Sequence, residues 1–283
     1  MRFAILLIGI VLTSGCSGVK KQENISILPV PPFDRLYVKN MHPEKPLFLG
    51  KIDRTKEDGR SGSIMYPGQN GAAFLASVLT HAAINSGVQK ARKKEKQERA
   101  NKVWESYQGV TNQTSFDALV PSSLKLDSGK VIEAFPYSLK EPAENSWVAE
   151  VSPVFYMSDK KNSLTLKSEV SFSQSSNPSS KKIKVTAIYI SDENSMDLTG
   201  VHSSEQSHLI DIFKSMFSRT LAMASNFSEG LYDSGQKEKS ETLRYLEDSQ
   251  KKVERGKVIS INDERVVFFT LRDEVKSAPL YFE

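Results

Sequence analysis

Two segments in the middle of the chain alternate between apolar and polar side chains, and this alternation constrains the fold more than any other feature. In Ser163–Ser173 (SLTLKSEVSFS), Leu, Leu, Val and Phe fall on one side and Thr, Lys, Glu and Ser on the other. Lys182–Ser191 (KIKVTAIYIS) repeats the pattern after a polar loop. Side chains of a strand point to alternate faces, so both segments predict half-buried strands that pair as antiparallel neighbours.

Further strands are expected on both sides of this pair. Trp147–Met157 (WVAEVSPVFYM) predicts a third strand, in which Pro153 needs an edge or a bulge because proline has no N–H for a ladder. Arg35–Lys39 and Leu47–Ile52 are short β-favouring runs near the start of the chain. The tail predicts a hairpin in which KVISI and RVVFFTL flank a polar turn.

Two helices are predicted between the middle strands and this hairpin. Gln206–Asn226 repeats apolar residues at helical spacing, so we expect an amphipathic helix that lies on the sheet. Lys237–Arg255 predicts a second, more polar helix, ended by Gly256 in a left-handed cap.

The segment Gly71–Tyr107 has an Ala-rich first half and a highly charged second half, which predicts one long helix or two in series. Small residues along one face of the 71–88 part form a possible packing or self-association face: Ala72, Ala76, Ala83 and Gly87. Packing on the sheet is the favoured interpretation, and self-association or a membrane-inserted element are the alternatives. The second half carries a basic cluster that we interpret as a solvated helix face, with contact to anionic lipid as the alternative: Lys90, Arg92, Lys93, Lys94, Lys96, Arg99 and Lys102.

Together these elements predict an α+β fold. Its antiparallel sheet packs with the long Ala-rich and charged helix and with the second amphipathic helix, and the chain ends in a β-hairpin. We expect one α+β domain over residues 35–283, because no repeat and no second boundary is evident.

The N-terminus has the features of a cleaved secretion signal. Arg2 provides a positive start, Phe3–Leu12 is apolar, and Thr13, Ser14 and Gly15 are small. An apolar run of this length is well short of the roughly 20 residues that a transmembrane helix needs. We therefore interpret residues 1–15 as a signal peptide.

The residues around the only cysteine refine this interpretation. Leu12-Thr13-Ser14-Gly15-Cys16 resembles the lipobox of bacterial lipoproteins, although Thr13 stands where Leu is usual. The resemblance implies that Cys16 carries covalent lipid and becomes the new N-terminus, with residues 16–34 as a lipidated tether. Ser17 after the cysteine favours, by analogy, the outer membrane of a bacterial envelope, facing the periplasm. A single cysteine has no internal disulfide partner, which suits this role.

The sequence contains no recognisable catalytic, metal-binding or nucleotide-binding constellation. There is no G-x-S-x-G elbow, and the four histidines have no metal-ligand spacing: His42, His81, His202 and His208. Asp127–Lys130 (DSGK) lacks the upstream glycine of a phosphate loop and is interpreted as a turn before a strand. Asp192, Glu193 and Asp197 are interpreted as a solvated strand end. We expect no catalytic, metal or cofactor site, and the net charge of +4 does not indicate nucleic acid as a partner.

The order of segments carries one further resemblance. A Gly/Ala helix that runs into a Lys/Arg/Glu-rich one, a strand-rich middle and the terminal RGKVISINDERVVFFTLRDEVKSAPL are similar to uncharacterised envelope lipoproteins of proteobacteria. No activity is implied by this likeness. The leading hypothesis is a non-enzymatic, membrane-anchored structural or binding component of the cell envelope, with the bilayer, an envelope protein or polymer, and a second copy of the chain as expected partners. The alternatives are an envelope hydrolase with a dispersed active site and an oligomeric membrane-perturbing assembly formed through the 71–88 helix.

Overall fold

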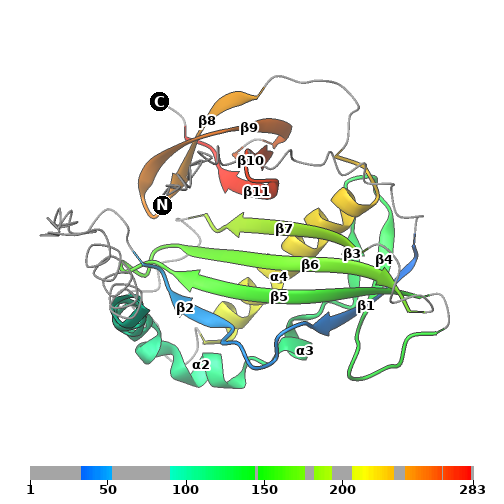
Figure 1. Ribbon diagram of the computed structural model, residues 1–283, viewed down its shortest axis with the longest axis horizontal. Helices are drawn as coiled ribbons and strands as arrows, with labels where there is room; N and C mark the ends of the chain where they lie inside the picture. Colours follow the sequence, from blue (N-terminus) through cyan, green and yellow to red (C-terminus); the bar gives the residue numbers. More distant parts are fainter. Residues whose placement is uncertain are drawn as a thin grey trace, which may run out of the picture.

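The computed structural model describes residues 33–52, 90–143, 146–175, 182–192, 206–232, 240–262 and 264–281. Within these ranges the chain forms one mixed sheet of eleven strands (Figure 1). The strands are β1 (Arg35–Asn40), β2 (Phe48–Gly50), β3 (Ser123–Lys125), β4 (Val131–Pro136), β5 (Trp147–Met157), β6 (Leu164–Gln174), β7 (Ile183–Ile190), β8 (Glu241–Glu247), β9 (Gln250–Asn262), β10 (Arg265–Thr270) and β11 (Glu274–Pro279). Their order is β3-β4-β1-β5-β6-β7-β11-β10-β9-β8, and β2 also pairs with β5.

The predicted fold class is wrong, because the sheet is mixed and much larger than expected. The middle strands β5, β6 and β7 are antiparallel neighbours, as their alternation predicted. However, β1 is parallel to both β4 and β5, and β11 is parallel to β7. Alternation reports which face a side chain takes, but neither the direction nor the identity of the neighbouring strand. The antiparallel α+β arrangement therefore does not hold beyond the centre of the sheet.

The main core lies between the sheet and α4 (Gln206–Ser228), which crosses behind the central strands in Figure 1. This helix is the predicted amphipathic one, and its buried stripe includes Leu209, Phe213 and Phe217. Apolar side chains of β5 and β6 face it, among them Phe155 and Phe172. The ring centroids of Phe155 and Phe213 are 4.9 Å apart. One face of the central sheet is thus committed to this core.

The helix predicted over Lys237–Arg255 is absent, because residues 241–247 and 250–262 form β8 and β9. Leu243 and Tyr245 alternate into a second core and hold β8 as a strand. Gly256 lies inside β9 and has no positive φ, so the predicted left-handed cap is also wrong. Close packing explains why a glycine occupies this position, because a Cβ there would lie 2.3 Å from the backbone oxygen of Phe269.

The second core belongs to a C-terminal lobe formed by β8 to β11, which lies above β7 in Figure 1. The predicted hairpin is present, since β9 and β10 pair antiparallel. The outer strand β8 bends back toward the end of β11 and forms a bridge between Tyr245 and Leu280. Ile188 and Ile190 of β7 complete this core, so the lobe shares a strand with the main sheet.

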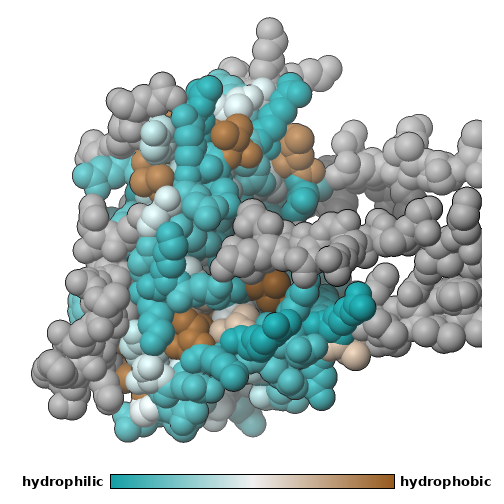
Figure 2. Space-filling view, turned by 90° about the vertical axis from the view of Figure 1, so that its left-hand side faces the viewer, coloured by the Kyte–Doolittle hydropathy of each residue, from teal (hydrophilic) through white to brown (hydrophobic). Residues whose placement is uncertain are grey.

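The charged half of the Gly71–Tyr107 segment is helical over residues 90–101 and continues into η2 (Lys102–Tyr107), followed by α2 (Gln108–Gln113) and α3 (Phe116–Leu119). The Ala-rich half of this segment, up to residue 89, lies outside the described residues. The charged half packs at the edge of β2 and not on the face of the sheet, so the predicted packing is wrong for this half. Ion pairs of 3.8 Å join Lys94 to Glu98 and Arg99 to Glu95 along its exposed side. The side of the molecule that includes this helix is mainly hydrophilic, with small and separate apolar patches (Figure 2).

No helix in the described part of the chain is both long enough and apolar enough to cross a bilayer.

Candidate functional site

The candidate site is a groove on the sheet face opposite α4, and it begins with a gap beside β5. On one flank of β5, β1 pairs up to Val151 and β2 pairs from Phe155 onward. The chain between Met41 and Leu47 leaves the sheet in the interval. The Met41 N–H donates to the Val151 oxygen at 2.8 Å, and the Phe155 N–H donates to the Leu47 oxygen at 2.7 Å. These two bonds mark the borders of the gap.

Pro153 occupies the gap, and this explains how a proline sits in the middle of a central strand. Backbone groups of alternate residues point to the same flank, so residue 153 faces the same side as Val151 and Phe155. Within the described ranges no strand lies beside Pro153 on this flank, so the missing N–H leaves no acceptor unsatisfied. Pro153 was expected at an edge, and at this one residue β5 is indeed an edge. Elsewhere along its length β5 has neighbouring strands on both flanks.

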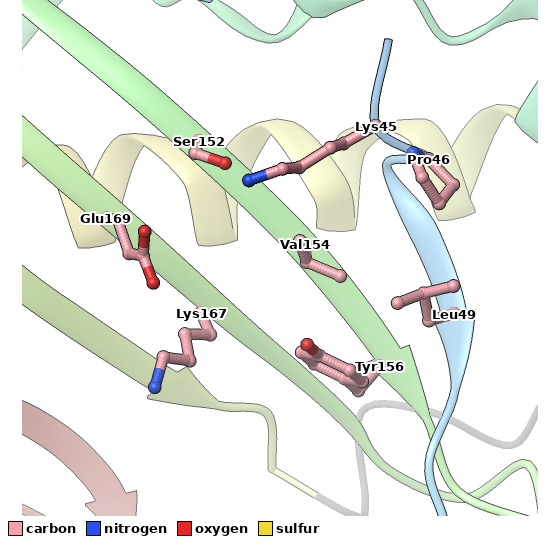
Figure 3. Close-up of a pocket in the computed structure, with 8 residues that line it drawn as sticks. All are labelled: Lys45, Pro46, Leu49, Ser152, Val154, Tyr156, Lys167 and Glu169. Carbon is pink, nitrogen blue, oxygen red and sulfur yellow. The ribbon is translucent and has the colours of Figure 1, made fainter. Parts of the chain in front are cut away.

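The groove opens where the 41–47 segment leaves the sheet, and its volume is about 270 Å³. Figure 3 shows its lining side chains on the face of β5 and β6 turned away from α4, with the β2 segment as a wall. Apolar side chains and polar groups share the lining: Lys45, Pro46, Leu49, Ser152, Val154, Tyr156, Lys167 and Glu169. An apolar surface with a few convergent polar groups is the usual character of a ligand site.

The charges in the groove are only partly neutralised by the protein. The Lys167 ammonium binds Glu274 of β11 at 2.8 Å, and that carboxylate is mostly buried. Lys45 and Glu169 make no ion pair with another residue in the described ranges. In Figure 3 the Lys45 side chain extends from the loop toward Ser152, while Lys167 and Glu169 project from β6. The groove therefore offers one cation and one anion to a ligand.

Tyr156 adds a hydroxyl to the lining of the groove. Burial raises the pKa of this phenol above 10.0, and Glu169 raises it further, while Lys167 acts in the opposite direction. The phenol is therefore protonated at neutral pH and can donate or accept a hydrogen bond. The set of one ammonium, one carboxylate and one phenol suits recognition of a ligand that itself carries both charges.

None of the residues singled out from sequence as a candidate site is among the described residues that line the groove. Cys16, Ala72, Ala76, Ala83 and Gly87 fall outside the described residues, as do His81, His202, Glu193 and Asp197. His42 lies at the start of the 41–47 segment, 3.3 Å from the Glu44 carboxylate, and His208 is exposed on α4. Asp192 pairs with Arg265. Among the described residues no three His, Cys, Asp or Glu side chains gather as a metal site would require.

The DSGK segment is a turn, as its interpretation predicted. It joins β3 to β4, and Gly129 adopts a φ of +83°. Asp127 accepts a hydrogen bond from the Tyr232 hydroxyl at 2.9 Å, and Asn226 donates to the same hydroxyl at 2.9 Å. Lys130 donates to the Phe33 carbonyl at 2.7 Å. These contacts fasten the turn to the end of α4 and give the segment a structural role.

Sequence reasoning missed the groove because its residues come from three separate segments. The alternation in Ser163–Ser173 does place Lys167 and Glu169 on the polar face, and Pro153 does indicate an irregular neighbour. Neither signal reveals that Lys45 meets them in space. The combination depends on the parallel pairing of β2 with β5, which no local pattern encodes.

No family model matches the chain, and no curated protein or solved structure is significantly similar to it.

Proposed function

We propose that this chain is a lipid-anchored protein of the bacterial cell envelope that works by binding, with the groove beside β5 as its ligand site. The anchor rests on the N-terminal sequence, in which an apolar run and three small residues precede Cys16. Acyl chains attached to that thiol hold a protein on a membrane without a transmembrane helix, since each buried CH₂ contributes about 0.8 kcal/mol.

The ligand class follows from the unneutralised charges in the groove, which are the observation that carries the proposal. Lys45 attracts a carboxylate, Glu169 attracts an ammonium, and Tyr156 can hydrogen-bond a further polar group of the ligand. Leu49 and Val154 provide apolar contact. A short peptide segment with both charges, from an envelope protein or from a polymer that carries amino acids, satisfies all of these groups.

Fatty-acid labelling tests the anchor. Cells that express the wild-type chain or Cys16→Ser are fed an alkyne fatty acid, and the purified proteins are examined for the label. We expect label on the wild type alone. Equal labelling of the two proteins, or none on either, contradicts anchoring through this cysteine.

Calorimetric titration tests the groove. Ala-Ala-Ala with free termini is the probe, compared with the same peptide blocked at its amine or its carboxylate. We expect the free peptide to bind and both blocked forms to bind several-fold more weakly. Lys45→Glu is expected to abolish the preference for a free carboxylate, and Glu169→Lys the preference for a free amine. Lys125→Glu, an exposed change on β3, is the matched control. Affinities that do not respond to blocking or to either groove variant contradict the proposal.

A further inference from the structure

The hairpin of β8 and β9 has an outward face of unusual charge. Leu243 and Tyr245 point into the second core, so Thr242, Arg244 and Leu246 lie on the opposite face. The pairing register sets Arg244 opposite Val253 and Thr242 opposite Arg255.

All the charged side chains on this face are positive. The pairing of β8 with β9 gives its members as Thr242, Arg244, Leu246, Lys251, Val253 and Arg255. Arg244 and Arg255 are exposed, and neither forms an ion pair with another described residue. Lys251 lies over the ring of Tyr281, 4.5 Å from its centroid. Val253, between the two arginines, is 61% exposed.

Arg244 and Arg255 lack the ion pairs that other exposed cations of the described residues make. Opposite charges directly across neighbouring strands stabilise a sheet, but the residues opposite Arg244 and Arg255 are the uncharged Val253 and Thr242. The basic helix over residues 90–101, by contrast, pairs Lys94 with Glu98 and Arg99 with Glu95.

We propose that the outward face of the β8–β9 hairpin docks on an anionic lipid bilayer. Charge complementarity favours a bilayer as the partner of this face: the guanidinium groups of Arg244 and Arg255 meet headgroup phosphates, and Val253 contacts the interfacial region between them. The inference rests on the proposed membrane anchoring only for the presence of a bilayer nearby. The lipid would hold the chain at the surface, and this face would orient it there.

Vesicle sedimentation with the unlipidated mature chain tests the inference separately from the anchor. Residues 16–283 carrying Cys16→Ser are mixed with vesicles of phosphatidylcholine alone or with added phosphatidylglycerol. We expect binding only to the anionic vesicles, and release in high sodium chloride. Arg244→Gln with Arg255→Gln is expected to weaken partitioning roughly thirty-fold, at about 1 kcal/mol for each cation near the surface. Arg244→Lys with Arg255→Lys keeps the charge and is expected to bind like the wild type.

Arg92→Gln with Lys93→Gln removes the same charge from the basic helix and is the matched control. It is expected to bind within a few-fold of wild type. An equal loss in the control and the hairpin variant overturns the proposal, because attraction to the whole protein would then account for binding. Binding that does not depend on anionic lipid, or no binding at all, overturns it as well. Failure here leaves the result of fatty-acid labelling unaffected.

Discussion

Gly50 lies where the helix over residues 90–101 approaches the edge of β2 most closely, and replacing it with alanine tests this packing. The Asn101 side chain accepts a hydrogen bond from the Gly50 N–H at 2.9 Å. Gln97 donates to the Gly50 oxygen at 2.8 Å. A Cβ on residue 50 would lie 1.9 Å from the backbone oxygen of Ala100. The helix backbone cannot rotate away as a side chain would, so the whole contact has to open.

The expected cost of Gly50→Ala is about 3–5 kcal/mol in the free energy of unfolding. Overpacking contributes about 1–3 kcal/mol. Loss of the two hydrogen bonds adds about 1 kcal/mol each. Gly129→Ala is the matched control, because that position has a φ of +83° but nothing within 4 Å of an added Cβ. The control is expected to cost only about 1–2 kcal/mol, from the backbone conformation.

Guanidinium unfolding followed by tryptophan fluorescence measures both variants, since Trp104 is buried beside Phe48 at a centroid distance of 5.1 Å. A double-mutant cycle with Asn101→Ala adds a second test. That change is expected to cost about 1 kcal/mol in the wild type and almost nothing in the Gly50→Ala background, where the hydrogen bond is already lost. If Gly50→Ala costs no more than Gly129→Ala, the close approach of helix and strand is refuted.

Three further predictions concern the C-terminal lobe. Gly256→Ala brings a Cβ within 2.3 Å of the Phe269 oxygen and is expected to cost at least about 1–3 kcal/mol, seen as faster amide hydrogen exchange in β9 and β10; unchanged exchange argues against this contact. Burial and two nearby carboxylates raise the pKa of Tyr245 above its ordinary 10.0, so its contribution to stability is complete below pH 10 and is lost as the pH rises through the folded-state pKa. Stability measured by urea unfolding between about pH 9 and pH 11 is therefore expected to fall more for the wild type than for Tyr245→Phe, and an equal fall contradicts the assignment. Lys51 forms ion pairs of 2.5 and 2.6 Å with the two carboxylates at the β8–β9 turn, so Lys51→Met is expected to cost about 1–2 kcal/mol and to speed exchange at that turn, whereas Lys51→Arg is expected to restore most of the protection.

Local periodicity was sufficient to predict several elements. The alternation in β5, β6 and β7 and the helical stripe of α4 each repeat over many residues, and one face of each is buried. In such segments the apolar repeat occurs several times in succession, so the segment boundaries were predicted to within a few residues. What these patterns do not contain is the partner of a strand, and β1 binds segments about one hundred residues further along the chain.

The hairpin of β8 and β9 shows why a helix was predicted where strands exist. Its residues include many Lys, Arg, Glu and Leu, which favour helices, and tertiary packing overrides such weak preferences. The turn gives no hairpin signal either. Asp248 and Ser249 adopt φ values of 58° and 57°, a conformation for which glycine or asparagine is the usual marker. In β8 only Leu243 and Tyr245 indicate a strand. Two apolar positions are too few to distinguish the two-residue repeat of a strand from the 3.6-residue repeat of a helix.

The candidate groove was beyond sequence reasoning for a related reason. Lys167 and Glu169 were placed on the polar face of their strand, where solvent is the simplest neighbour. Their relation to Lys45 arises because β2 returns to the flank of β5 after the gap at Pro153. When a site is formed by residues from strands that are distant in sequence, no local sequence motif marks it.

Mass spectrometry of the N-terminal peptide, taken from protein isolated from the membranes of its own cells, tests the central claim most directly. The account predicts a peptide that begins at residue 16 and whose mass includes a diacylglycerol on the thiol. A free, unmodified Cys16 thiol, or a peptide that still contains residues 1–15, would contradict a lipid-anchored envelope protein.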